Sequence, residues 1–321
     1  MSISHGEGVD TVPCLHLIDL DQDLPGQRSF ISCWVSVQDG LVFIVDPGPP
    51  STADHLIARL EGLGISHLDF ILLTHVHLDH GGCTARVLER WPETKVVCHE
   101  KGRPHLVDPT MLWKGSLAVL GHKAEVYGEP APVPAAALAD FDTLLARGVE
   151  TIPTPGHAAH HVAYRHGDHL FLGEAAGTFS DLGDGSATGQ YYLRPATPPR
   201  FFPEVARASL DRLLALDPLP GRFLFAHHGE FTGDTRGLLT TARNQLCLWV
   251  ETTAAILEVQ RGLPHSEQPT DEAGLMDLIA ARLAQVDPHF ARGADLAVDI
   301  RAREQDFTRQ TLRGILEYLR R

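Results

Sequence analysis

The spacing of apolar residues alternates between that of strands and that of helices. Short apolar runs predict strands at residues 14–20, 31–37, 41–45, 68–74 and 95–99. A helical spacing predicts helices from about residue 52 to 63 and from about residue 81 to 91. The run at 41–45 is apolar throughout, which indicates a buried strand.

A similar alternation returns in the second half of the chain. Strands are predicted at 150–152, 162–165, 169–172 and 223–226, and helices at 202–216, 234–260, 271–285 and 305–319. Residues 102–134 are less regular and predict an insertion or flap with partial helix, and residues 183–189 predict a flexible acidic loop. Two passes of strands and helices followed by a helical tail predict an α/β fold of two face-to-face layers with a C-terminal helical region.

Composition narrows the class of protein. A chain of 321 residues suits one large domain, or one domain with an appendage. The formal charge of −14 argues against nucleic acid as the main partner, although it leaves a small phosphorylated substrate open. We expect no membrane partner and a cytoplasmic location, because residues 1–11 lack signal-peptide character and no apolar run approaches the roughly 18 residues of a membrane span.

Five cysteines occur in an odd number, at wide spacings and without a C-x-x-C pair. This pattern predicts buried free thiols rather than a disulfide framework or a zinc ribbon. Cys83 stands out because it lies three residues beyond a cluster of histidines, and histidine, with 19 copies, is the outlier of the composition.

Four potential metal ligands fall within six residues at His75, His77, Asp79 and His80. They follow a predicted strand directly, and a loop there presents its side chains at the carboxyl edge of a sheet. Imidazole and carboxylate groups are ligands for zinc, iron and manganese. Gly81-Gly82 is expected to let the backbone turn sharply beside the metals. The H-x-H-x-D-H pattern therefore predicts a metal site rather than a solvated loop.

This pattern resembles the first metal motif of the metallo-β-lactamase superfamily, and the resemblance covers about residues 10–235. It implies a catalytic domain built as a four-layered αββα sandwich, with residues 236–321 as a C-terminal helical extension.

Three later segments are similar to further motifs of that superfamily. Pro155-Gly156-His157 supplies His157 as a ligand, and Gly173-Glu174 places Glu174 where the family normally has a metal-bridging aspartate. His227 is favoured as the final ligand because it directly ends the last predicted strand, and the adjacent His228 remains an alternative.

The resemblance implies two divalent metal ions, with zinc favoured and iron or manganese as alternatives. The first would be held by His75, His77 and His157, the second by Asp79, His80 and His227, with Glu174 between them. Two such metals lower the pKa of a shared water, which then attacks an ester, thioester, lactone or phosphodiester bond of a small molecule. Asp79 would also steer the leaving-group proton.

Three residues near these motifs receive lesser roles. Asp46 matches an earlier family motif and is expected to orient the metal-binding loop, with a simple turn as the competing interpretation. His161 is expected to act outside the ligand set at most, and His160 is expected to be a bystander.

Substrate selection is expected to come from the flap at 102–134 and from a loop at 190–195. Tyr191 or Tyr192 would polarise a substrate carbonyl and Arg194 would pair with an anionic substrate, although packing explains all three equally well. Trp249 is expected to cover the mouth of the site or to form an oligomer contact. The oligomeric state is left open, with a homodimer as one option.

Two other classes of function compete with the hydrolase. A mononuclear iron dioxygenase or redox enzyme on the same fold needs fewer ligands than are present here, but the Glu174 departure keeps it open. A metal-retaining binding or regulatory protein is disfavoured by the intact ligand set, and nucleic-acid processing by the charge.

Overall fold

One sheet contains the N-terminal strands. The computed structural model describes residues 14–183, 189–264, 266, 269 and 271–321. The sheet has six strands in the order of the chain, β1 Cys14–Asp19, β2 Ser32–Gln38, β3 Leu41–Val45, β4 Phe70–Leu72, β5 Lys95–Val97 and β6 Leu138–Ala139. The first three strands pair antiparallel, and the strands from β3 onward pair parallel.

A second sheet contains strands from the other half of the chain. Its order is β13-β12-β9-β8-β7. The bounds are β7 Val149–Pro153, β8 Val162–His166, β9 His169–Gly173, β12 Arg222–Phe225 and β13 Glu230–Phe231. A single bridge between Ile31 and His227 links the two sheets beside the site.

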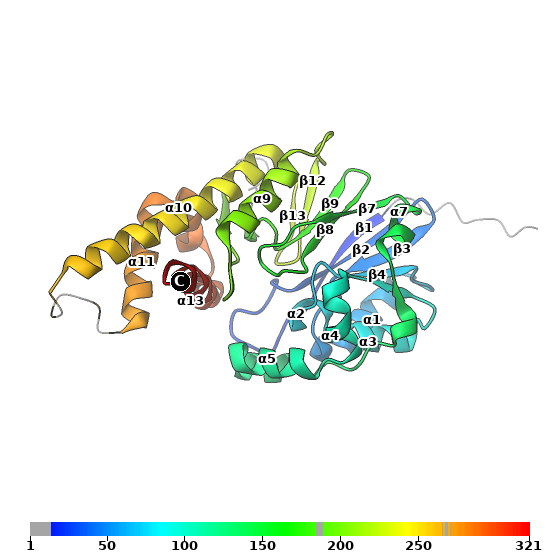
Figure 1. The fold of residues 1–321 in the computed structure, drawn as a ribbon. Helices are drawn as coiled ribbons and strands as arrows, with labels where there is room; N and C mark the ends of the chain where they lie inside the picture. Colours follow the sequence, from blue (N-terminus) through cyan, green and yellow to red (C-terminus); the bar gives the residue numbers. More distant parts are fainter. Residues whose placement is uncertain (1–13, 184–188, 265, 267–268, 270) are drawn as a thin grey trace, which may run out of the picture.

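The two sheets pack face to face between layers of helices (Figure 1). Alternate residues of β3 show the layering, because Phe43 packs between the sheets against Phe171 while Ile44 joins the outer core under the helices. This two-sided burial explains why the run at 41–45 is apolar throughout. The predicted four-layered α/β sandwich is confirmed.

The helices and short helical turns cover both outer faces. On the first sheet lie η1 Pro50–Thr52, α1 Ala53–Gly62, α2 Leu78–Gly81, α3 Thr84–Arg90 and η2 Glu100–Gly102. Next in the chain come η3 Ala135–Ala137 and α7 Phe141–Leu145, and Leu144 of α7 belongs to the core between the sheets. On the second sheet lies α9 Pro203–Leu214, followed by the C-terminal helices α10 Thr235–Gly262, α11 Glu272–Val286, α12 Pro288–Ala291, η5 Arg292–Asp295 and α13 Val298–Leu319.

The predicted flap is more helical than its sequence indicates. It contains α4 Arg103–Val107, α5 Thr110–Leu120 and α6 His122–Tyr127. The expected partial helix is present, and its extent is not evident from the sequence because α5 buries none of its residues fully.

The strands β10 Thr178–Asp181 and β11 Tyr191–Arg194 pair antiparallel, and β11 occupies the segment 190–195 that is predicted to be a loop. The part of the predicted acidic loop at 184–188 lies outside the described residues. The four residues of β11 are buried, which removes them from the surface role that a loop would give them.

The C-terminal helices share a core with the second sheet. Leu238, Ile279 and Leu312 belong to the same buried cluster as Phe223 and Phe225.

Trp249 of α10 lies within this core. Its side chain has no exposed surface, and its indole N–H donates to Asp287 Oδ2 at 2.8 Å. The expectation that Trp249 covers the site or forms a surface contact is therefore wrong. None of the described helices combines the length and apolar character that a membrane span requires.

Candidate metal centre

The histidine motif lies where β4 leaves the first sheet. His75 and His77 stand in the loop, whereas Asp79 and His80 already belong to the short helix α2. The predicted helix start at about residue 81 is thus three residues late, and Gly82 has a helical φ of −62° rather than a sharp turn.

Glycine is required at position 82 because a side chain would not fit there, and not because the backbone adopts an unusual conformation. A Cβ atom at Gly82 would lie 2.4 Å from the Leu78 carbonyl oxygen and 2.6 Å from Pro50 Cδ. The expected turn at Gly81-Gly82 is therefore corrected to a tightly packed helix end, which holds the motif against η1.

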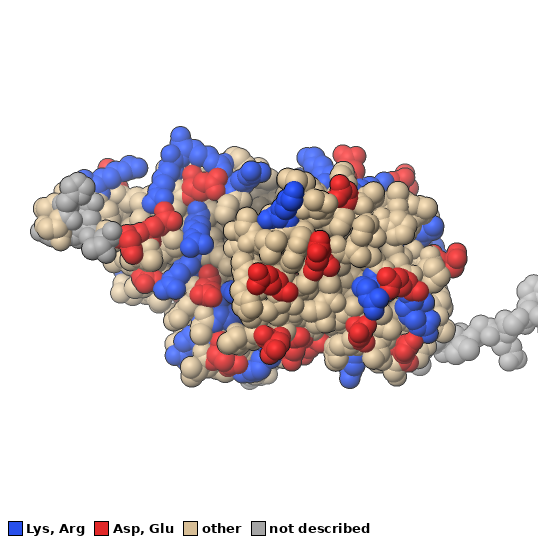
Figure 2. Space-filling model, turned by 90° about the horizontal axis from the view of Figure 1, so that it is seen from below, with Lys and Arg blue, Asp and Glu red and all other residues tan. Residues whose placement is uncertain are grey.

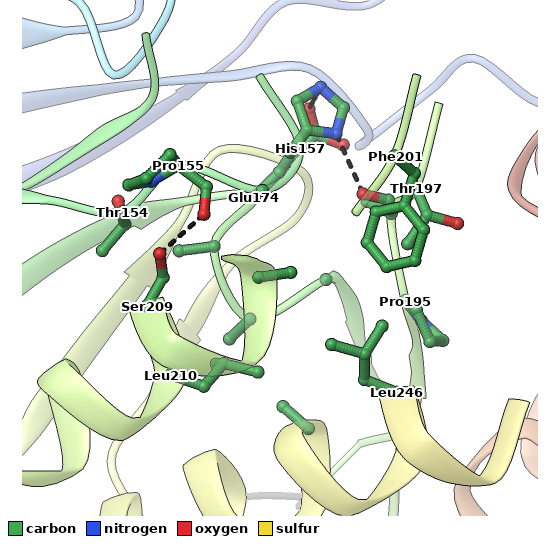
Figure 3. Close-up of a pocket in the computed structure, with 17 residues that line it drawn as sticks. Thr154, Pro155, His157, Glu174, Pro195, Thr197, Phe201, Ser209, Leu210 and Leu246 are labelled. Carbon is green, nitrogen blue, oxygen red and sulfur yellow. Dashed lines mark hydrogen bonds and ion pairs between the residues drawn. The ribbon is translucent and has the colours of Figure 1, made fainter. Parts of the chain in front are cut away.

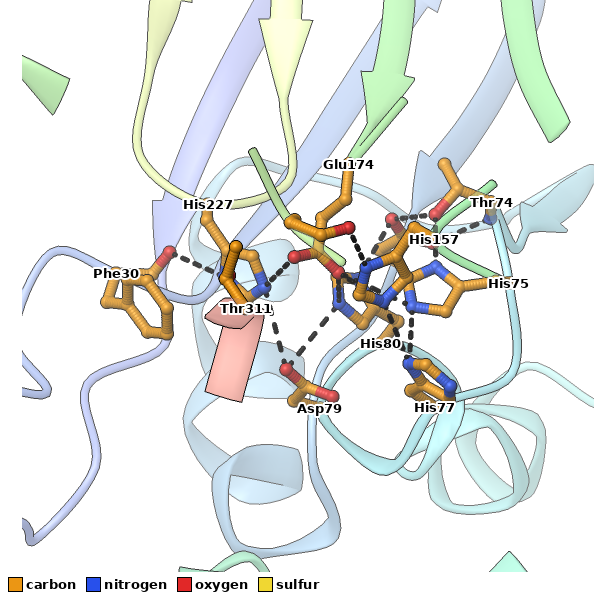
Figure 4. A network of polar contacts seen from close by, with 12 residues as sticks. Phe30, Thr74, His75, His77, Asp79, His80, His157, Glu174, His227 and Thr311 are labelled. Atoms are coloured by element: carbon orange, nitrogen blue, oxygen red, sulfur yellow. Dashed lines mark hydrogen bonds and ion pairs between the residues drawn. The ribbon is translucent and has the colours of Figure 1, made fainter. Parts of the chain in front are cut away.

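The second sheet supplies three further side chains. His157 follows β7, Glu174 follows β9 and His227 follows β12. These strands run in the same direction, because β7 and β9 are both antiparallel to β8 and β12 is parallel to β9. Their carboxyl ends therefore meet at one edge, facing the histidine motif (Figure 4).

The structure brings all seven predicted ligands together in two groups. One comprises His75, His77, His157 and Glu174, and the other Asp79, His80 and His227. Within each group the ligand atoms lie within 4.8 Å of one another.

The first group is the tighter one. His77 Nδ1 lies 3.0 Å from His75 Nε2 and 3.1 Å from His157 Nε2. Glu174 Oε2 lies 2.9 Å from His157 Nε2 and 3.6 Å from His75 Nε2. Three ring nitrogens and one carboxylate oxygen thus face a common point.

The second group is organised around Asp79. Asp79 Oδ2 lies 3.5 Å from His80 Nε2 and 3.6 Å from His227 Nε2. Glu174 also reaches this group, with Oε2 3.4 Å from His80 Nε2 and Oε1 3.5 Å from His227 Nε2. Its carboxylate therefore contacts both groups.

Hydrogen bonds behind the cluster fix the orientation of the rings. The Thr74 hydroxyl donates to Asp46 Oδ2 at 2.7 Å, so its oxygen is left to accept the Nδ1 proton of His75 at 3.1 Å. In the same way, the Nδ1 atoms of His157 and His227 face the carbonyl oxygens of Ala196 and Phe30 at 3.1 and 3.3 Å. The Nε2 lone pairs of these rings are thereby directed into the cluster.

Charge in the cluster suits a cation. Burial lowers the pKa of His77 to about 3 and that of His75 well below its ordinary value, so both imidazoles are neutral. Burial alone would raise the pKa of Glu174, but His157 and His227 hold it well below its usual range. Neutral imidazoles at His75 and His77 beside the ionised Glu174 carboxylate thus offer lone pairs and negative charge to a cation.

A buried ring nitrogen without a hydrogen-bond partner supports the same conclusion. His80 Nε2 is buried and makes no hydrogen bond, while its Nδ1 lies 3.2 Å from Asp46 Oδ2. Burial disfavours the charged ring, yet Asp79 and Asp46 hold the pKa of His80 well above its ordinary value. The surroundings of Nε2 thus favour positive charge, and the donor set fits divalent metal ions.

His161 positions the backbone that carries Glu174. Its ring is fully buried, and its Nε2 accepts the Glu174 backbone N–H at 3.1 Å. A Cβ atom at Gly173 would lie 2.5 Å from that nitrogen, and the φ of +55° there also favours glycine. His161 therefore acts behind the ligand set, in the place where the sequence expected it.

The positions of His228 and His160 decide between the roles that the sequence left open for them. His228 has a φ of +62° and belongs to neither ligand group, so His227 is the member of the pair that reaches the cluster. His160, expected to be a bystander, accepts the Val76 backbone N–H at 3.1 Å and so braces the motif loop.

The expected substrate contacts of β11 are replaced by packing. Tyr191 is buried and stacks on His289 with ring centroids 4.5 Å apart, and Tyr192 is 1% exposed. The guanidinium of Arg194 is buried and donates to Glu304 Oε2 at 2.6 Å. Both tyrosine roles are wrong, and Arg194 is already paired, because the sequence does not reveal the partner strand and helix that cover them.

The cluster opens into a cavity of ≈ 660 Å³. Its floor includes His77, Asp79, His157, Glu174 and His227, and its walls come from α5, from α13 and from residues 194–200. A volume of this size accommodates a small organic molecule.

A second, much smaller cavity of ≈ 30 Å³ lies behind His157 and Glu174 (Figure 3). It has room for about one or two water molecules. Beside it, the Ser209 hydroxyl of α9 donates to the Pro155 carbonyl oxygen at 2.6 Å, which fixes the loop that carries His157.

The chain is similar to proteins of one family. A family model described as the metallo-beta-lactamase superfamily matches residues 26–228. A "metallo-beta-lactamase fold-containing protein ST1585" from Sulfurisphaera tokodaii is 30% identical over 176 residues, which cover 51% of this chain and 62% of that relative. A "hydroxyacylglutathione hydrolase" from Xanthomonas axonopodis pv. citri is 28% identical over 238 residues, covering 72% of this chain and 71% of the relative.

Solved structures show the same fold at low sequence identity. The archaeal ST1585 from Sulfolobus tokodaii superposes with a TM-score of 0.62 and 20% identity, covering 95% of this chain and all of the other. The metallo-beta-lactamase family protein TTHA1429 from Thermus thermophilus gives a TM-score of 0.57 at 20% identity, with 95% and 93% of the two chains covered.

Proposed function

This chain belongs to the metallo-β-lactamase superfamily, and from that membership we propose that it is a hydrolase with two divalent metal ions that cleaves a carbonyl ester, thioester or lactone of a small molecule. The observation that carries the proposal is the position of Glu174. Its carboxylate contacts nitrogens of both ligand groups, at 2.9 Å from His157 Nε2 and 3.5 Å from His227 Nε2. A carboxylate in that position suits a ligand shared by two metals.

Some residues of the site would only hold metal, whereas others would also face the substrate. His75 and His80 are almost fully buried beneath the cavity, so they hold metal and do not meet the substrate. Asp79 keeps 18% of its side chain exposed and lines the cavity, which supports a role for its carboxylate in receiving and passing on a proton during bond cleavage. When bound, divalent metals supply an activated water and polarise the carbonyl group.

The similar proteins favour carbonyl chemistry over phosphodiester cleavage. The bacterial relatives include several named as hydroxyacylglutathione hydrolases, whose name describes an acyl substrate. Zinc is our proposed metal because three to four nitrogen and carboxylate ligands per group match its preferences.

Metal content tests the two-metal proposal. We expect about two equivalents of zinc per chain in protein purified without added metal, measured by ICP mass spectrometry. His227→Asn should lose about one equivalent, whereas His228→Asn, a change at the neighbouring histidine outside both groups, should keep both. Equal metal loss in the two variants would contradict the ligand assignment, and one equivalent of iron alone would favour oxygen chemistry instead.

Hydrolysis tests the proposed reaction. Ester, thioester, lactone and phosphodiester substrates are assayed with the metal-loaded protein and with His77→Ala. We expect hydrolysis of at least one carbonyl substrate and its loss in the variant. Hydrolysis of the phosphodiester alone would overturn the proposed bond class.

A further inference from the structure

Helix α5 is an apolar helix that contributes little to the core. Its sequence, Thr110–Leu120, contains one charged residue, Lys114, and none of its residues is fully buried. Met111 is 66% exposed and Val119 is 58% exposed, although both are large and apolar. Such exposure is unfavourable in water unless another molecule covers the helix.

One side of α5, including the exposed Met111 and Val119, faces the cavity over the candidate metal centre. Two rows of residues four apart line it along the whole helix, namely Met111, Leu112, Gly115, Ser116, Val119 and Leu120. Trp113 and Leu117 pack against the core of the first sheet and hold the helix in place. One apolar face is thus anchored while another is left open to the cavity.

The opposite wall is also apolar where it approaches the cluster. Phe30, Pro198 and Phe307 line it. The cations nearest this wall have partners within the protein: Arg194 pairs with Glu304, and Lys123 pairs with Asp306 at 3.2 Å. Arg200, which has an exposed side chain, stands at the rim.

The molecular surface agrees with this distribution of charge. Figure 2, which views the molecule from the side of α5, shows tan surface interrupted by Asp and Glu side chains in the middle of the face. Lys and Arg side chains lie mostly toward the C-terminal helices and at the opposite end of this face. The surroundings of the cavity therefore suit an uncharged apolar group.

We propose that α5 is the acyl-chain wall of the site, and that the substrate is an ester, thioester or lactone whose acyl group carries a medium-length aliphatic chain. This inference rests on the proposed hydrolase function. The cavity is continuous from His77 and Asp79 to Met111 and Val119, so one molecule spans the cluster and the apolar wall. Each methylene buried along α5 should raise kcat/KM by about fourfold until the wall is filled.

Gly115 offers a sharp test of this wall. A Cβ atom there would have no heavy atom within 4 Å, and the residue lines the cavity, so a larger side chain would project into the open volume. Leucine also has the higher helix propensity, so Gly115→Leu should fold. The matched control is Gly62→Leu, at the exposed end of α1, where a Cβ likewise meets nothing within 4 Å.

The experiment compares p-nitrophenyl esters with acyl chains of two to ten carbons on the metal-loaded, full-length protein. We expect kcat/KM to rise with chain length in the wild type and in Gly62→Leu. The ratio of long-chain to short-chain kcat/KM should fall about tenfold or more in Gly115→Leu, since its side chain takes the place of two or more methylenes. Val119→Asp should lower the same ratio by placing a charge on the wall.

A binding measurement separates this inference from the hydrolase proposal. Calorimetric titration with butanoate, hexanoate, octanoate and decanoate should show tighter binding with chain length and a negative heat-capacity change, both weakened in Val119→Asp. Chain-length-dependent binding without hydrolysis of any probe would support the apolar wall and overturn the hydrolase proposal.

Three outcomes would overturn the acyl-chain inference. One is hydrolysis with no dependence on acyl length, which would leave the hydrolase proposal intact. Another is a dependence only on the alcohol chain in a series of acetate esters, which would move the apolar group to the leaving side. A third is a dimer in sedimentation velocity that dissociates in Val119→Asp while the chain-length ratio is unchanged, because a second copy would then cover α5.

Discussion

Asp46 joins the first sheet to the candidate metal centre through one side chain. Its backbone is left-handed, with a φ of +52°, and Oδ1 accepts the Thr74 N–H at 2.8 Å. Oδ2 accepts the Thr74 hydroxyl and lies 3.2 Å from His80 Nδ1. A strained residue with three polar contacts is more than a turn former, and these contacts orient a ligand from each group.

Replacing Asp46 should weaken metal binding without removing a ligand. In Asp46→Asn the negative charge beside His80 is lost and one acceptor becomes a donor, so we expect metal affinity to fall about 10–100-fold. Competition with a chromophoric chelator measures this. The control is Asp69→Asn, which loses a similar backbone brace to Val42 at the other end of β4 and should keep its metal affinity. Equal affinities in the two variants would argue against the orienting role.

The five cysteines differ in burial, and therefore in the reactivity of their thiols. Cys33, Cys83 and Cys98 are buried, whereas Cys14 is exposed and Cys247 is partly exposed. Burial raises the pKa of Cys83 and of Cys98 to about 12 and that of Cys33 well above its usual value. The prediction of five buried thiols is therefore wrong for Cys14.

Alkylation with iodoacetamide at pH 8 should modify only the accessible thiols. Because the thiolate is the reactive form, Cys83 and Cys98 should stay unmodified in the native protein and react after unfolding. Intact-mass and peptide mass spectrometry report the sites. Native modification of Cys83 at the rate of Cys14 would show that the helix behind the histidine motif opens readily.

Single residues differ in how well the sequence reveals them. His75, His77, Asp79 and His80 are recognisable because metal chemistry explains four ligands within six residues. The partners from the second sheet were located only through the family resemblance. The sequence around Phe30 does not indicate that this residue supports the site. Its ring stacks on His227 of the other sheet, with ring centroids 4.2 Å apart.

At the scale of elements, β3 and β4 are predictable because both faces of each of these two strands are apolar. The run at 41–45 is β3 with the predicted bounds. Elements whose burial depends on a distant partner are not evident from the sequence. Strand β11 forms by pairing with β10. Helix α13 begins at Val298 rather than at about residue 305. The missed first turns of α13 matter, because they contact the site.

Helix α13 supports the metal centre through Arg303. Its guanidinium lies 4.1 Å from the centroid of the Phe30 ring, on which His227 stacks, and it donates to the Gly26 carbonyl oxygen at 2.8 Å. Arg303 also pairs with Glu304 at 3.0 Å. The helix thus clamps the loop before β2 against a predicted ligand.

Removing this clamp should loosen the second ligand group. Arg303→Met leaves Glu304 with Arg194 alone, and we expect unfolding free energy to fall by about 2–4 kcal/mol and the metal content of the His227 group to fall with it. Urea denaturation and metal analysis measure the two effects. Arg309→Met on the same helix removes an exposed pair with Asp277 and should change stability by no more than about 0.5 kcal/mol. Similar losses in both variants would mean that α13 acts only through its general packing.

At the scale of the whole molecule, the sequence predicted the layered fold because alternating strands and helices permit few arrangements. The shape of the cavity could not be predicted, since its walls come from α5, α13 and residues 194–200, which are far apart in the chain. Their contact depends on how the C-terminal helices dock, and helical periodicity does not specify that docking.

The resemblance implies a catalytic domain at 10–235 with residues 236–321 as a C-terminal helical region, and the packing leads us to predict that the two parts fold together. Leu246, Leu312 and Ile315 share one core with Phe179 and Phe225, so a chain that ends at residue 234 would expose the outer face of the second sheet. It would also lose Arg303 behind Phe30. We expect residues 1–234 alone to aggregate, or to bind ANS and unfold without a cooperative transition.

Co-expression of the two pieces tests whether the truncated chain fails because it lacks the packing of the C-terminal helices. Residues 235–321 supplied as a separate chain carry the same apolar faces of α10, α11 and α13, so the two pieces should co-purify and recover cooperative unfolding and bound metal. If residues 1–234 instead stay monomeric, unfold cooperatively and retain metal, the C-terminal helices are an appendage, and their part in forming the cavity wall becomes their main contribution. Because the same helices form both core and wall, we expect folding and substrate selection to be lost together.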